Sequence, residues 1–182
     1  MRLTRIGIAI FVLAVIAGPL YTVQGYSAVG NLISELAAQN TPRNFLMSGA
    51  FVALGAAIVA DGARTHHASV APFLAFGFFM ALAGLFGHKP INPDLPYLAW
   101  AHTVHGALAT TAGISISVAF IWQAIRQRHA TQRVVAAVLA TLCFALPMAM
   151  LWLPEFQGAI QRLMYVLVFA WLWQYYPRAT HA

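Results

Sequence analysis

The stretch LPYLAWAHTVHGALATTAGISISVAFIWQAI, residues 95–125, contains no Asp, Glu, Lys or Arg. A helix rises about 1.5 Å per residue, so this stretch is long enough to cross the roughly 30 Å hydrocarbon core of a bilayer. His102 and His105 stand near its start, three residues apart, and therefore lie on one face of the helix. An ionisable side chain in an apolar span is costly without partners, so this pair marks a candidate functional site.

The composition of the whole chain indicates an integral membrane protein. Hydrophobic residues make up 61% of the 182 residues and charged residues 8%, too little polar surface to cover a water-soluble domain. The formal net charge of +6 comes from basic residues that are dispersed rather than gathered in one patch. We therefore expect membrane lipids as partners and no nucleic acid. The only cysteine, Cys143, excludes an internal disulfide.

Apolar runs separated by short polar turns predict an all-α, polytopic fold, with one domain of six transmembrane helices over residues 1–182. We expect the first run to be retained as a span, because its apolar part is long and no small-residue cleavage site follows it. Apolar residues at helical spacing in the segment 28–39 predict a short amphipathic helix at the outer membrane boundary. The expected spans cover residues 6–24, 44–60, 68–87, 97–123, 134–153 and 156–176.

The second and third expected spans have two local features. The turn between them contains His66 and His67, which we expect to be solvated. Small residues let helices approach closely in membranes. We expect such approach at four glycines, Gly49, Gly55, Gly77 and Gly84.

The distribution of basic residues predicts the orientation in the membrane. With six spans, seven basic residues fall on one side: Arg2, Arg5, Arg64, Arg126, Arg128, Arg133 and Arg178. Three fall on the other: Arg43, Lys89 and Arg162. The excess of Lys and Arg on cytoplasmic loops then predicts a multi-pass protein of the inner or plasma membrane with both termini in the cytoplasm.

Six spans in this orientation bring polar residues from distant parts of the sequence to the outer third of the molecule. Arg162 is the most informative of them, because it lies about two turns inside the sixth span and an unpaired guanidinium is expensive at that depth. The residues expected at this level are Ser34, Glu35, His88, Asp94, His102, His105, Glu155 and Arg162.

Three interpretations of these residues remain open. In the first, Arg162 pairs with Glu35, Asp94 or Glu155 and only fixes a loop to the bundle. In the second, they form a polar site, roofed by the segment before the second span, that binds a lipid headgroup or another small amphiphile. Arg162 would then bind a phosphate or carboxylate. The residues proposed to bind the ligand are Ser34, Glu35, Asp94, His102, His105 and Arg162.

The third interpretation is a metal-dependent hydrolase acting on a lipid. His102 and His105 would supply nitrogen ligands and Asp94 an oxygen ligand, with Glu35 as a fourth ligand or general base. Three protein ligands and a water are typical of hydrolytic zinc. No cofactor is required by the sequence, and zinc is the candidate if a metal binds.

The order of several short motifs resembles a family of mostly bacterial and archaeal six-span membrane proteins, catalogued as domain of unknown function nine-nine-eight. The motifs are Ser34-Glu35-Leu36, Gly84-Leu85-Phe86, Asp94, His102, His105 and Gln161-Arg162. The resemblance covers nearly the whole chain and implies the six-span fold and a role for Glu35, Asp94, His102, His105 and Arg162. It implies no reaction. Gly87 stands where the family usually has proline, which affects the loop that carries Asp94.

Overall fold

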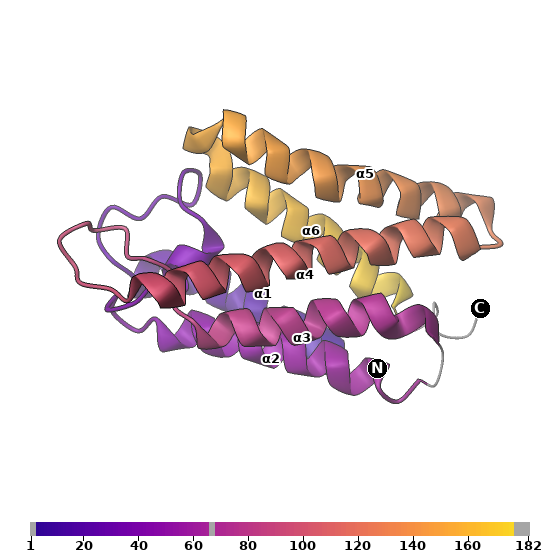
Figure 1. Cartoon of the computed structure of the whole chain (residues 1–182), viewed down its shortest axis with the longest axis horizontal. Helices are drawn as coiled ribbons and strands as arrows, with labels where there is room; N and C mark the ends of the chain where they lie inside the picture. Colours follow the sequence, from indigo (N-terminus) through magenta and orange to yellow (C-terminus); the bar gives the residue numbers. More distant parts are fainter. Residues whose placement is uncertain (1–2, 66–67, 177–182) are drawn as a thin grey trace.

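The computed structural model of the protein describes residues 3–65 and 68–176, and Figure 1 shows its arrangement. Arg2, His66, His67 and Arg178 therefore lie outside the described residues. The described part is built from helices, turns and loops, which confirms the all-α prediction. Its α-helices are α1 (Leu3–Tyr21), α2 (Phe45–Gly62), α3 (Ala71–Leu85), α4 (Ala99–Arg126), α5 (Ala130–Trp152) and α6 (Gln157–Tyr175). Three short 3-10 helices are η1 (Ile33–Ala37), η2 (Ala68–Val70) and η3 (Pro154–Phe156).

Each helix packs against the next one along the chain, and α6 returns to contact α1. Figure 1 shows α4 and α5 close together at their connecting turn and diverging away from it. We call the end of the bundle with residues 22–44, 86–98 and 153–156 the site end. The end with residues 63–70 and 127–129 is the opposite end.

Four helices, α1, α2, α4 and α5, are long and apolar enough to cross a membrane. Helix α3 is apolar but has 15 residues, and α6 carries Gln161 and Arg162 near its start. Trp100 and Trp122 are exposed near the two ends of α4, and the helical rise separates them by about 33 Å. That distance is close to the roughly 30 Å of the hydrocarbon core, and Trp is enriched at both membrane interfaces. The protein is thus a helical membrane protein.

The observed helices start and end a few residues away from the expected spans, and α4 begins at Ala99 and runs to Arg126. The larger difference concerns the segment 28–39, where a surface amphipathic helix was expected. Only Ile33–Ala37 is helical, as a single 3-10 helix, and each of these five residues is buried. The expectation was wrong because the segment enters the bundle, where Leu36 packs on Gly18 of α1.

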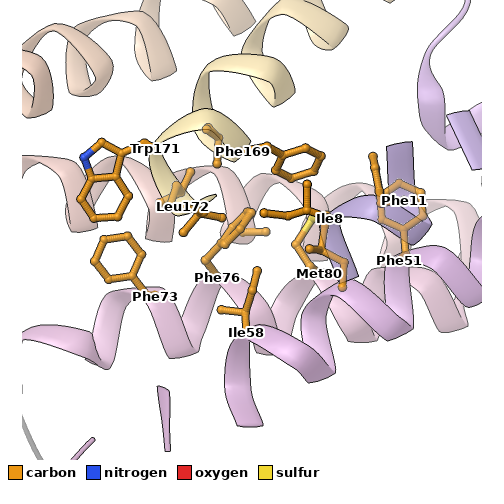
Figure 2. Close-up of a cluster of buried hydrophobic side chains, with 14 of the residues drawn as sticks. Ile8, Phe11, Phe51, Ile58, Phe73, Phe76, Met80, Phe169, Trp171 and Leu172 are labelled. Carbon is orange, nitrogen blue, oxygen red and sulfur yellow. The ribbon is translucent and has the colours of Figure 1, made fainter. Parts of the chain in front are cut away.

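The core draws side chains from all six α-helices and is rich in aromatic rings, many of them on α1, α2, α3 and α6 (Figure 2). Phe73 of α3 stacks on Trp171 of α6, with ring centroids 5.1 Å apart and planes 7° apart. Phe11 of α1 contacts the ring edge of Phe51 of α2 at 5.1 Å. Offset and edge-to-face pairs such as these add to the dispersion energy of a buried core. The pair of Phe73 and Trp171 fixes α6, the least apolar helix by composition, to α3.

Asp61 at the opposite end is a buried acid whose role was not anticipated. Its carboxylate accepts hydrogen bonds from the backbone N–H of Thr4 at 2.8 Å and from the Thr4 hydroxyl at 2.9 Å. Arg64 lies 3.3 Å from its second oxygen. A negative charge at the first turn of α1 is favourable because the N-terminal N–H groups of a helix carry partial positive charge. Asp61 therefore joins the start of α1 to the end of α2.

Helices α2 and α3 approach closely at Gly55 and Gly77. A Cβ atom added to Gly55 would lie 2.3 Å from the Gly77 carbonyl oxygen, too short for any real contact. Gly84 is also tightly packed, by Phe51 and Ser48 of α2. Gly49, by contrast, has no atom within 4 Å of such a Cβ, so the expectation of close approach there was wrong.

This difference predicts opposite effects for two chemically identical substitutions. Gly55→Ala should destabilise the protein by about 3 kcal/mol, because the backbones of α2 and α3 must separate. Gly49→Ala should leave stability unchanged or raise it by up to about 1 kcal/mol, because Ala favours the helix more than Gly does. Unfolding of both variants in detergent measures the difference. Equal stabilities would contradict the observed helix contact.

Candidate functional site

Arg162 fixes the loop that precedes α2 to the start of α6. Its guanidinium donates hydrogen bonds to the carbonyl oxygens of Asn31 and Gly158, each at 2.9 Å, and to the hydroxyl of Tyr26. Among the residues that the structure describes, it forms no ion pair with an acidic side chain. The expected partner Glu35 instead accepts the backbone N–H of Leu32 at 2.6 Å. The first interpretation was right about loop fixation and wrong about the acidic partner.

Two further contacts hold the same loop against α6. The backbone N–H of Ile33 donates to the side-chain oxygen of Gln161 at 2.6 Å, and that of Ala159 donates to the Val29 carbonyl at 2.9 Å. Gly158 allows this contact, because a Cβ there would lie 2.2 Å from the Asn31 carbonyl oxygen. The buried 3-10 helix η1 thereby reaches a fixed position between α1 and α6.

Three histidine rings form a cluster where the loop after α3 meets α4. The ring centroid of His88 lies 4.5 Å from that of His102 and 5.6 Å from that of His105. His105 is buried, and its Nδ1 lies 2.9 Å from the Ala83 carbonyl oxygen and 2.8 Å from that of Phe86. Both partners are acceptors, so Nδ1 carries the hydrogen. Nε2 is then the acceptor nitrogen of the neutral ring.

The same reasoning assigns the other two rings. His88 Nδ1 lies 2.9 Å from the Lys89 carbonyl oxygen and donates to it, which leaves Nε2 as its acceptor. His102 Nδ1 accepts the backbone N–H of Lys89 at 3.3 Å, so its hydrogen is on Nε2. Burial lowers the pKa of His88 to about 4, and the neighbouring His105, His102 and Lys89 also lower it. His88 is thus uncharged at neutral pH.

A cavity of about 410 Å³ lies between α4, α5 and α6, below η1. Its polar residues at the site end are Ser34, His88, His105 and Gln161. The rest of the wall is mainly apolar, with Ile114, Phe144, Pro147, Met148 and Met164, and it also includes Thr110 and Ser117 of α4. The cavity is within the range of about 300–1,000 Å³ that ligand sites occupy. We call it the α4–α5–α6 cavity.

The cavity has an opening at the side of the bundle. Ile114 of α4 and Phe144 and Met148 of α5 line it and are each about half exposed. Gly106 and Gly113 of α4 also line it, and no atom lies within 4 Å of a Cβ added to either. This is the region where α4 and α5 diverge in Figure 1. The opening is therefore bordered by exposed apolar side chains.

Asp94 is not part of this site. It is exposed in the loop 86–98, where its backbone N–H donates to the Asn92 side chain. Among the residues that the structure describes, no group of three or more His, Cys, Asp or Glu side chains is arranged to hold a metal ion. The third group beside His102 and His105 is His88 rather than Asp94. The zinc site of Asp94, His102 and His105 stays a prediction without geometric support.

The expected site residues therefore separate into three groups. Ser34 and His105 line the cavity, and the ring of His102 contacts the ring of the lining residue His88. Glu35 and Arg162 bind the η1 loop instead. Asp94 is exposed outside the site. His88 was expected at this level but not as a ligand-binding residue, and Gln161 was seen only as the neighbour of Arg162. The sequence contains little that singles out these two residues as site residues, because neither Gln nor a loop His is unusual at the end of a span.

Fold and site together define a six-helix membrane protein with a laterally open cavity at one end. The chain belongs to the DUF998 family, described as a protein of unknown function, whose sequence model matches residues 5–174. This confirms the resemblance inferred from the motifs. Neither the curated proteins nor the solved structures provide a match to the chain.

The contacts of His105 predict a specific stability effect. His105→Leu leaves the carbonyl oxygens of Ala83 and Phe86 without their donor, which should cost about 2 kcal/mol. His105→Asn should cost less, because its amide N–H stands the same number of bonds from Cα as Nδ1–H. Thermal unfolding of both variants in detergent measures the difference. If both variants lose the same amount of stability, the hydrogen bonds of His105 Nδ1 contribute nothing to the stability of the protein.

The low pKa of His88 predicts a pH-dependent stability. Its pKa of about 4 in the folded protein lies below the ordinary 6.5, so the unfolded chain binds more protons between these values. Stability should therefore fall as pH decreases from 6.5 towards 4, by about 3 kcal/mol from this residue. His88→Asn removes the titration and keeps a donor for the Lys89 carbonyl. Its unfolding free energy should fall less over this range, and parallel curves would contradict the burial of a neutral His88.

Proposed function

We propose that the protein binds an amphiphile in the α4–α5–α6 cavity. The polar head would lie at Ser34, His88, His105 and Gln161, and the chain would extend along α4 towards Ser117. The observation that carries the proposal is the mixed lining of the cavity, in which a few polar side chains at the site end adjoin a mainly apolar wall. A lipid likewise joins a polar head to an apolar chain.

The dimensions of the cavity support a lipid-sized ligand. His105 and Ser117 both line it, and the helical rise separates them by about 18 Å. One leaflet of the hydrocarbon core is about 15 Å thick, so an acyl chain of ordinary length would fit. The lateral opening beside Ile114 and Phe144 gives such a chain a route from the bilayer without passing through water.

The distribution of charge supports a cytoplasmic position for the opposite end. Of the described basic residues, Arg5, Arg64, Arg126, Arg128 and Arg133 lie at that end. Arg5 stands over the ring of Trp173 and Arg126 over that of Trp122, at 5.3 and 4.8 Å from the centroids. Such pairs suit a membrane interface, where one side of the ring is apolar and the other wet. In an inner or plasma membrane the ligand would then enter from the outer leaflet.

Filling the cavity tests the proposal. Gly113→Leu places a side chain in space that is empty in the structure, so the fold should tolerate it. We expect lipid extracted with the purified protein to fall at least 10-fold per molecule of protein. Gly49→Leu is the matched control, because Gly49 is also a helical glycine with open space but does not line the cavity. Quantitative lipid mass spectrometry of both variants gives the answer, and equal lipid contents would contradict the proposal.

A further inference from the structure

We infer that the ligand of the α4–α5–α6 cavity is a lipid with an uncharged head that carries a free hydroxyl group, of the diacylglycerol type. The inference rests on the proposed function and specifies the chemical class of the ligand. It follows from which polar atoms of the cavity are free and which are already used.

The cavity offers no charged partner for an anionic head. Among the described residues that line it there is no Asp, Glu, Lys or Arg. The nearest guanidinium, that of Arg162, already donates to the carbonyl oxygens of Asn31 and Gly158 and to the hydroxyl of Tyr26. The side chain of Lys89 is exposed. A phosphate buried here would lack the cationic partners that normally compensate its desolvation.

The free polar atoms are suited to a hydroxyl group instead. The Nδ1–H groups of His88 and His105 are bound to backbone carbonyl oxygens, so each ring presents Nε2 as an acceptor. Within the part of the chain that the structure describes, these two Nε2 atoms have no hydrogen-bond partner. A phosphate diester has no hydrogen to give them, whereas a hydroxyl group has one.

The same head can also accept a hydrogen bond in the cavity. Ser34 is a buried residue, and its hydroxyl lines the cavity and has no hydrogen-bond partner among the described residues. The side-chain oxygen of Gln161 accepts the Ile33 N–H, which leaves its NH₂ group as a donor. A glycerol head with ester carbonyls and one hydroxyl supplies acceptors for these donors and one hydrogen that either of the two Nε2 atoms can accept.

The charge state of His88 agrees with this assignment. Burial lowers the pKa of His88, so its Nε2 keeps a lone pair at neutral pH. The titratable and charged groups that face His88 are Lys89, His102 and His105, and their charges lower its pKa further, whereas the hydrogen bond to the Lys89 carbonyl raises it in part. The His88 ring thus resists the protonation that would let it bind an anion.

Competition between lipids with the same acyl chains tests the inference. Radiolabelled dioleoylglycerol is bound to detergent-solubilised wild-type protein on beads at neutral pH and displaced by unlabelled competitors. We expect dioleoylglycerol to compete at least 10-fold better than dioleoylphosphatidic acid, in which a charged phosphate is esterified to that hydroxyl group. It should also compete at least 10-fold better than acetylated dioleoylglycerol, which lacks the hydroxyl group. Equal or better competition by either of these two lipids would overturn the inference.

Variants separate this inference from the proposed function. Ser34→Ala should weaken dioleoylglycerol binding several-fold, and His88→Arg should shift the preference towards phosphatidic acid. If all three lipids bind with equal strength, the head specificity is overturned. If that binding is also abolished by Gly113→Leu and retained by Gly49→Leu, the cavity remains a lipid site. Failure of wild-type protein to bind any of the three, with equal extracted lipid in the two glycine variants, would overturn both.

Discussion

Hydrogen bonds from the Arg162 guanidinium allow a non-helical segment of backbone to lie inside the membrane bundle. Backbone N–H and C=O groups at membrane depth must be satisfied within the protein, because lipid offers them no hydrogen bonds. Arg162 binds the carbonyl oxygens of Asn31 and Gly158, and Gln161 receives the Ile33 N–H. The loop before α2 can therefore enter the bundle as the 3-10 helix η1. That helix covers the site end of the α4–α5–α6 cavity.

The same constraint explains why few polar groups at this end are free to act on a ligand. His105 binds two carbonyl oxygens at the end of α3, and Gln39 binds the carbonyl oxygens of Gly87 and Leu98. Glu35 binds the backbone of its own turn. Most side chains that looked functional in the sequence are thus used to complete backbone hydrogen bonding. What remains for a ligand is uncharged: two ring nitrogens, a hydroxyl and an amide.

The sequence predicts the helical class and the family well, because apolar runs and their order are local properties. It also predicts that Arg162 needs partners. These partners are backbone carbonyl oxygens, and because every residue has one, the sequence does not show which of them Arg162 binds. Asp94 is close to His102 in sequence, yet it lies in a turn, where the Leu95 N–H binds the Asn92 carbonyl oxygen, and its side chain is exposed. Gly49 and Gly55 are equivalent in the sequence and differ only in which helix face meets α3. Burial of η1 was missed because apolar residues at helical spacing, with Ser34 and Glu35 between them, suggested an amphipathic helix with one polar face.

Hydrogen–deuterium exchange of the segment 29–38 tests the central claim most directly. In detergent, peptides covering this segment should exchange slowly, on the timescale of the spans, because its N–H groups bind Ser27, Glu35, Leu32 and Gln161 and residues 33–38 are buried. The loop 90–97 serves as the exposed reference. Exchange of the segment 29–38 as fast as that loop would contradict a buried η1 and remove the roof of the cavity.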